Sequence, residues 1–170
     1  MGQRTRGLAA RAGVSPEVGE AIGGAAMSTV EVRRAYPRPV EDVWAAITVP
    51  EAVARWLAPT GFKAEVGHRF PVRLDHAAAG GQLAFEAQVT EVEPPRALAL
   101  AANVGGQAHT VRFELEPVAE GTAVTVRHGG FGGMFAAFLE PTIRRVWDTI
   151  LNERLASVIE EVERGGDEVA

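Results

Sequence analysis

Apolar residues near the C-terminus recur at steps of three and four and predict one long helix over 141–164. They are Ile143, Val146, Trp147, Ile150, Leu151, Leu155, Val158, Ile159 and Val162. This spacing is typical of a helix that buries one face. Pro141 suits the first turn, where its missing N–H would have no helical partner. Gly165-Gly166 is expected to end the helix.

The chain before this helix alternates between apolar and polar residues in short runs separated by turns. Such runs cover 29–36, 62–66 (weakly), 69–74, 83–90, 97–102, 109–116 and 124–128. Alternation with a period of two predicts an antiparallel sheet with one wet and one buried face. Two short helices are expected between the first two runs, because Pro39 and Pro50 each precede apolar residues at helical spacing.

The predicted order is therefore one strand, two short helices, five or six strands and a long helix. It indicates an α+β fold in which a curved antiparallel sheet of about six or seven strands is covered by the C-terminal helix. We expect this domain to span 27–164, after a poorly ordered extension at 1–26 and before a flexible tail at 165–170. Met27 is an alternative start of the natural product.

Composition narrows the class of partner. The chain has 170 residues, a net charge of −5 and no cysteine. An acidic chain without clustered Lys and Arg is not expected to bind nucleic acid. Without thiols, no disulfide or thiolate metal site can form. No apolar run is long enough to span a membrane and no secretory signal is recognisable, so we expect a cytoplasmic protein. The sequence contains no phosphate- or dinucleotide-binding fingerprint, and we expect no cofactor. A homodimer is left open.

Two histidines carry the most informative polar chemistry. If the turn at 117–121 pairs Leu115 with Thr122, His109 lies opposite His128 on the inward face of the sheet. The pair would then either be hydrated at the open end of the sheet, line a pocket, or hold a metal. A metal site formed by the two histidines would lack an obvious third ligand. Within a pocket, one imidazole could act as a general base near neutral pH.

Glu91 is a third catalytic candidate, provided that a strand bulge before Pro94 turns it inward; otherwise it is simply solvated. A curved sheet that does not close fully on one helix leaves an apolar pocket, which is the default ligand site. We expect large apolar side chains to line it: Trp56, Phe70, Phe85, Val111, Phe113, Phe131, Phe138, Trp147 and Leu151. Trp56 could gate the pocket, and the glycine-rich segment 129–133 reads as its flexible portal.

Four segments resemble a known family. They are 36–44 at the entry to the first helix, 50–56 in the second helix, 91–98 at a central hairpin, and 121–131 with Trp147 and Leu151 beyond. Together, in this order, they resemble the helix-grip superfamily (START-like, SRPBCC, polyketide-cyclase-like). Within it, they are most similar to bacterial proteins of the AHSA type, homologues of the heat-shock chaperone ATPase activator.

The resemblance implies a helix-grip fold around a ligand cavity more firmly than it implies an activity. The leading expectation is that the protein binds, carries or sequesters a small hydrophobic molecule. The alternative is a cyclase- or dehydratase-like enzyme that uses a His or Glu of the cavity. Chaperone activation ranks third, because residues 1–26 are too short to be the extra N-terminal domain of the relatives that perform it.

Overall fold

The structure is a computed structural model that describes residues 28–57, 61–76, 81–133 and 136–169. Its first strand and the two short helices that follow are β1 (Ser28–Tyr36), α2 (Val40–Thr48) and α3 (Pro50–Trp56). Five strands come next: β2 (Arg69–His76), β3 (Gly81–Glu93), β4 (Ala97–Val104), β5 (Gln107–Val118) and β6 (Gly121–Phe131). The chain ends in α4 (Ala136–Thr149), the π-helical turn η2 (Ile150–Arg154) and α5 (Leu155–Val169). The predicted extension at 1–26 and Met27 lie outside the described residues.

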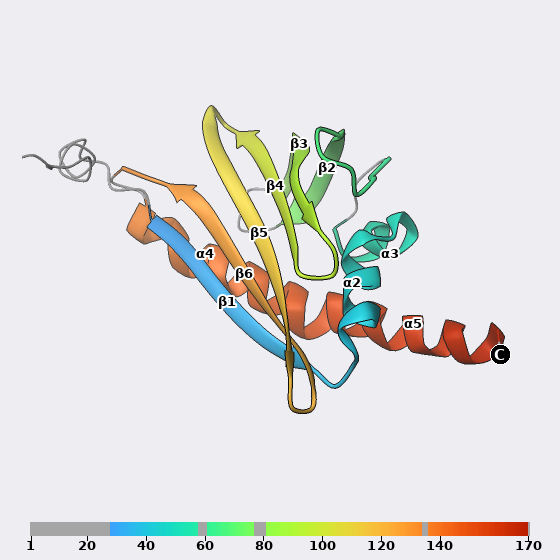
Figure 1. The fold of residues 1–170 in the computed structure, drawn as a ribbon. Helices are drawn as coiled ribbons and strands as arrows, with labels where there is room; N and C mark the ends of the chain where they lie inside the picture. The colour runs from blue at the N-terminus through green and yellow to red at the C-terminus, as the bar shows by residue number, and fades with distance from the viewer. Residues whose placement is uncertain (1–27, 58–60, 77–80, 134–135, 170) are drawn as a thin grey trace, which may run out of the picture.

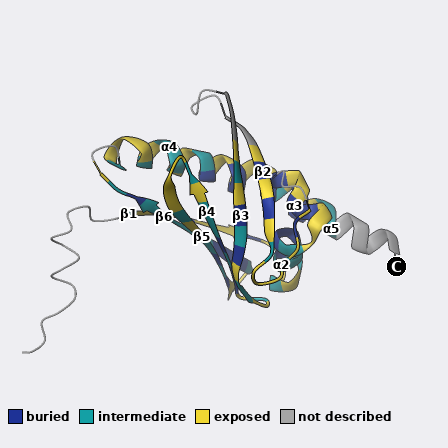
Figure 2. Ribbon diagram, turned by 90° about the horizontal axis from the view of Figure 1, so that it is seen from above, coloured by how far each residue is buried: buried dark blue, intermediate teal, exposed yellow. Residues whose placement is uncertain are grey.

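The strands form one curved antiparallel sheet in the order β1-β6-β5-β4-β3-β2. The continuous helix α4-η2-α5 runs diagonally across one face of it (Figure 1). Buried residues gather where the sheet, the two short helices and this long helix face one another (Figure 2). The predicted α+β helix-grip architecture is confirmed.

The weak strand predicted at 62–66 does not form. Residues 61–68 make an irregular connection that contains turns. Only Phe62 is deeply buried there, and one buried side chain does not give a strand a core-facing side. The segment nevertheless touches the sheet, because Gly67 N–H donates to the Val89 carbonyl and Val89 N–H donates to the His68 carbonyl.

The long helix extends further at both ends than the sequence predicts. It begins at Ala136, so Pro141 lies inside it and not in its first turn. Ala137 is exposed, so water can reach the backbone carbonyl that a proline at 141 leaves without a helical partner. Gly165-Gly166 does not end the helix, which continues to Val169 through the predicted flexible tail. Glycine lowers helix propensity by about 1 kcal/mol relative to alanine, which weakens a helix without stopping it.

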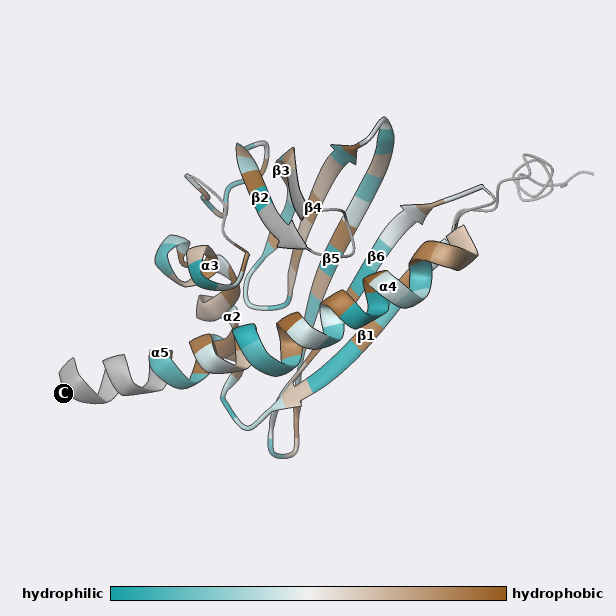
Figure 3. Ribbon diagram, turned by 180° about the vertical axis from the view of Figure 1, so that it is seen from behind, coloured by the Kyte–Doolittle hydropathy of each residue, from teal (hydrophilic) through white to brown (hydrophobic). Residues whose placement is uncertain are grey.

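The π-helical turn lets Ile150 and Leu155, which are five residues apart, both face the sheet. Helical steps from Ile150 lead to Arg154 and Ser157, which are exposed. The buried residues are instead Leu155 and Val158, one position further along. A π turn contains one more residue than an α turn, so it absorbs this extra position. Both halves of the helix therefore keep buried apolar residues toward the sheet, and hydrophobic and hydrophilic residues alternate along the ribbon of the helix (Figure 3).

The last hairpin has the predicted strands but not the predicted register. Leu115 pairs with Val124 instead of Thr122, and Val111 is the residue opposite His128. The strands continue through Pro117 and Val118, so only two residues, Ala119 and Glu120, form the turn. The error is two residues, which keeps every side chain on its predicted face because strands have a period of two.

None of the helices in the described ranges is both long and apolar enough to cross a membrane.

Candidate functional site

A cavity of about 180 Å³ lies between the inward face of the sheet and the C-terminal helix. Strands β2 to β6 form one wall, and Ile143, Val146, Trp147 and Ile150 of the helix form the other. Its surface is almost entirely apolar. An apolar cavity of about 150 Å³ can hold a molecule the size of benzene, so there is room here for a small ring compound.

Four of the predicted ligand-binding residues line this cavity: Phe85, Val111, Phe113 and Trp147. The Phe113 and Trp147 rings meet edge to face with centroids 5.7 Å apart, so the sheet and the helix touch at the wall of the cavity. Trp147 is placed there by α4, and Val111 and Phe113 by successive inward positions of β5.

Four others pack in the core beside the cavity without lining it: Trp56, Phe70, Phe131 and Leu151. The indole N–H of Trp56 donates to the Ala46 carbonyl oxygen over 2.9 Å, and its ring packs edge-on against Phe113. A tryptophan fixed in this way is a core residue, so its position does not support a gating role. Phe138 was also expected to line the cavity, but its side chain is 82% exposed at the start of α4.

The sequence reasoning missed the small residues that create the space. Ala87 on β3 and Ala101 and Ala102 on β4 line the cavity together with Leu57 and Leu100. A search for large apolar side chains finds what fills a core, whereas a cavity arises where small side chains stand opposite a helix. The alanine-rich run of β4, Ala97 to Ala102, was the available signal.

His109 and His128 do come together at the cavity wall, although they are not directly opposite. His128 Nε2 lies 3.2 Å from His109 Nδ1, and both residues line the cavity. The indole nitrogen of Trp147 lies 3.0 Å from His128 Nδ1 and donates to it. Three side chains from β5, β6 and α4 therefore form one hydrogen-bonded row, with the Phe131 ring packed against both imidazoles.

Both imidazoles are neutral at pH 7 in this environment. Burial, together with the nearby His109, lowers the pKa of His128 to about 4. Burial also lowers the pKa of His109 from its ordinary value. Desolvation acts in this direction because it disfavours the charged form of the ring. The pair is therefore an uncharged polar group in an otherwise apolar wall.

Glu91 lies on the opposite face of the sheet, which corrects its candidacy as a cavity residue. A bulge is present in β3 between Val89 and Glu91, but it turns Glu91 outward instead of inward. There the carboxylate binds the Arg112 guanidinium at two points, over 2.9 and 3.0 Å. This hydrogen bonding from Arg112 holds the pKa of Glu91 below its usual range.

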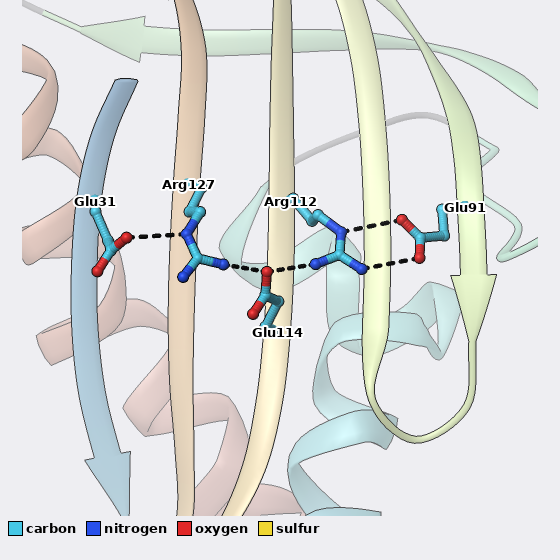
Figure 4. A network of polar contacts seen from close by, with 5 residues as sticks. All are labelled: Glu31, Glu91, Arg112, Glu114 and Arg127. Carbon is cyan, nitrogen blue, oxygen red and sulfur yellow. Dashed lines mark hydrogen bonds and ion pairs between the residues drawn. The ribbon is translucent and has the colours of Figure 1, made fainter. Parts of the chain in front are cut away.

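The outward Glu91 is one end of a row of alternating charges. Arg112 also contacts Glu114, which contacts Arg127, which in turn binds Glu31 over 2.9 Å (Figure 4). The residues of this row come from β3, β5, β6 and β1. Because Glu91 belongs to it, His109 and His128 are the remaining catalytic candidates at the cavity. Among the described residues, no group of three or more His, Asp or Glu side chains could hold a metal ion.

The chain is similar to several solved structures. It shares 28% identity with protein MLL2253 from Mesorhizobium loti, at a TM-score of 0.68 over 79% of this chain and 98% of that one. It also shares 28% identity with protein BH1534 from Bacillus halodurans, at a TM-score of 0.64 over 78% and 96% of the two chains. A third similar structure is DynU16, described as a protein in the dynemicin biosynthetic locus, at 28% identity and a TM-score of 0.62. That match covers 78% of this chain and 47% of DynU16.

No protein of curated function matches the sequence. The family model described as "Activator of Hsp90 ATPase homolog 1-like protein" matches residues 37–160. This range begins just before α2 and ends within α5, so it includes the strands β2 to β6, the cavity and both histidines. The chain belongs to the family of Activator of Hsp90 ATPase homolog 1-like proteins, within the helix-grip superfamily that its sequence resembles.

Proposed function

We propose that the protein binds a small hydrophobic molecule in the cavity between the sheet and the C-terminal helix, and so carries or sequesters it. The observation that carries this proposal is the almost wholly apolar cavity of about 180 Å³. A packed protein interior leaves few voids larger than a water molecule, so a space of this size in a small domain is a candidate ligand site.

The place of the cavity within the fold supports the same function. Its walls come from the central strands and the C-terminal helix, and the small side chains of Ala101 and Ala102 on β4 leave the space between these walls open. The outer face of the sheet carries the row of ion pairs instead. Among the described residues, the large apolar side chains that are exposed lie outside the strands, so this face offers little for a protein partner such as a chaperone.

Titration with naphthalene, followed by tryptophan fluorescence, tests the proposal. Ala102→Leu extends a side chain from β4 into the cavity and is expected to weaken binding at least tenfold. Ala35→Leu is the matched control, because Ala35 is an exposed residue of β1 outside the cavity, and it should bind as the wild type does. Saturable binding that both variants retain would place the ligand elsewhere and overturn the proposal.

A second candidate function, a cyclase- or dehydratase-like enzyme, is favoured by one specific observation. The cavity wall contains the hydrogen-bonded pair of His109 and His128, and a polar pair in an apolar site is costly unless it contributes structure or chemistry. A further support is the similarity to DynU16, whose description places it in a biosynthetic locus. Turnover of a bound carbonyl compound, lost in His109→Phe, would favour the enzyme over the carrier.

A further inference from the structure

The indole of Trp147 fixes which nitrogen of His128 carries the proton. An indole N–H is a donor and never an acceptor. His128 Nδ1, 3.0 Å from it, must therefore accept and be unprotonated. Since burial keeps this ring neutral by lowering its pKa, its single proton is on Nε2.

The tautomer of His128 in turn determines the tautomer of His109. His128 Nε2 lies 3.2 Å from His109 Nδ1, and because His128 Nε2 carries a proton, it donates. His109 Nδ1 must then accept, which leaves the proton of His109 on its Nε2. The row therefore has one direction, with N–H groups donating from Trp147 to His128 and from His128 to His109.

The opposite pair of tautomers, with His109 donating to His128, is energetically unfavourable. For His109 Nε2 to accept a proton as a general base, His109 would carry its own proton on Nδ1 and donate it to His128 Nε2. The proton of His128 would then lie on Nδ1, facing the Trp147 N–H. Two donors would meet in a buried site, which leaves both unpaired at a cost of about 1–3 kcal/mol each.

His109 Nε2–H is thus the free end of the row. His109 comes from an inward-facing position of β5, paired with Ala102, and lines the cavity. Among the described residues, no side chain or backbone group is seen to accept from this nitrogen. The two histidines are also the only titratable side chains that line the cavity in the described part of the chain, so no carboxylate competes for the donor.

We infer that the ligand of this cavity is an aryl ketone or aldehyde of one or two rings, whose carbonyl oxygen accepts a hydrogen bond from His109 Nε2–H. The inference rests on the proposed function, because it names the class of molecule that the same cavity takes. Trp147 and His128 are positioning residues that hold His109 in the donating tautomer. The ring body occupies the apolar space between Phe85, Val111 and Ile143.

The tautomers can be observed without any ligand. In long-range ¹H–¹⁵N correlation spectra of the full chain at pH 7, both His109 and His128 are expected to be protonated at Nε2 and unprotonated at Nδ1. In Trp147→Phe, which removes the indole N–H, His109 should show a mixture of both tautomers. Trp44→Phe, a tryptophan of α2 outside the cavity, is the matched control and should leave the His109 spectrum unchanged. A proton on His109 Nδ1 in the wild type would overturn the inference.

The ligand class is tested with acetophenone and ethylbenzene, which have the same shape and differ in the carbonyl oxygen. The quantity to compare is the ratio of the two dissociation constants, because this ratio cancels changes in cavity shape. His109→Phe should reduce the preference for acetophenone about fivefold, as expected for the loss of one hydrogen bond. His68→Phe, at a histidine outside the cavity, should keep the wild-type ratio.

The possible outcomes distinguish the inference about the ligand class from the proposed function of the cavity. Binding of both compounds with a ratio that His109→Phe leaves unchanged would overturn the inference and leave the proposed function standing. Binding of neither compound to the wild type, with naphthalene also failing, would overturn both. A reduced preference in His109→Phe, together with Nε2–H tautomers in the wild type, supports the inference.

Discussion

The Tyr36 hydroxyl donates a hydrogen bond to the Leu151 carbonyl oxygen over 2.7 Å, inside the π-helical turn of the C-terminal helix. Tyr36 ends the edge strand β1, and burial raises the pKa of its hydroxyl, so the group remains a donor at neutral pH. The contact joins the sheet to the helix at the point where the helix changes phase, one turn from the cavity residue Trp147. It therefore helps to set which helix residues face the cavity.

Tyr36→Phe removes this hydrogen bond while it keeps the ring. We expect the free energy of unfolding to fall by about 1–2 kcal/mol, since a buried carbonyl loses its partner. Urea denaturation measures the change. Phe138→Ala, at an exposed position, is the control and should stay within about 0.5 kcal/mol of the wild type. A stable Tyr36→Phe would mean that the contact does not anchor the helix.

The π turn predicts an unusual tolerance to deletion. Removing the exposed Glu153 turns η2 into a regular helical turn while Ile150, Leu151 and Leu155 keep their buried places. Removing the exposed Thr149 also makes the helix regular, but it moves Asn152 into the place of Leu151. We therefore expect the Glu153 deletion to fold with nearly wild-type stability.

The Thr149 deletion should lose several kcal/mol, because it buries an amide and withdraws apolar groups from the core. Thermal unfolding followed by circular dichroism compares the two proteins. Equal losses in both deletions would contradict the view that the π turn holds one surplus residue.

The neutral histidine pair predicts that acid destabilises the protein in a defined window. The pKa of His128 is about 4 when folded, against about 6.5 for an unperturbed imidazole. The unfolded chain therefore binds the proton more readily than the folded one between these values. This contribution to stability is fully present above about pH 6.5 and is lost as the pH falls toward 4. His109 acts in the same direction, since burial lowers its pKa as well.

The free energy of unfolding, measured by urea denaturation from pH 7 to pH 4, should fall by up to about 3 kcal/mol more in the wild type than in His128→Gln. Comparison with this variant removes the contribution of the carboxylates, which both proteins share. Parallel curves for the two proteins would show that His128 is not desolvated in the folded state.

Glu91 should not affect the cavity. Its carboxylate pairs with Arg112 on the outer face, so Glu91→Gln is expected to bind naphthalene with the wild-type dissociation constant. Exposed ion pairs contribute little to stability and are screened by salt. Any loss of stability should therefore be small and should vanish at high salt. Weakened naphthalene binding in Glu91→Gln would show that Glu91 contributes to the ligand site.

The sequence was informative wherever a local pattern decides the structure. Alternation fixed which strand residues face inward, so His109 and His128 were placed on the correct face although the register of their hairpin was wrong by two residues. The π turn left no such trace, because Leu155 follows Leu151 at an ordinary helical step of four and the segment therefore predicts a regular helix.

Features that depend on the whole fold could not be predicted in this way. The bulge in β3 reverses the face of Glu91, and nothing in the local alternation indicates at which residue it falls. The cavity depends on small side chains such as Ala102 lying under the helix, which requires knowing how the helix crosses the sheet. The contact between Trp147 and His128 joins α4 to β6, and only this contact defines the direction of the hydrogen-bonded row.

The central claim is that the cavity between the sheet and the C-terminal helix holds a small hydrophobic molecule. Native mass spectrometry of the full chain, purified under mild conditions, tests it most directly. We predict a population heavier than the bare chain by the mass of one small organic molecule, which is lost in Ala102→Leu and retained in Ala35→Leu. A bare chain in all three proteins that also takes up neither naphthalene nor acetophenone when these are added would contradict the claim.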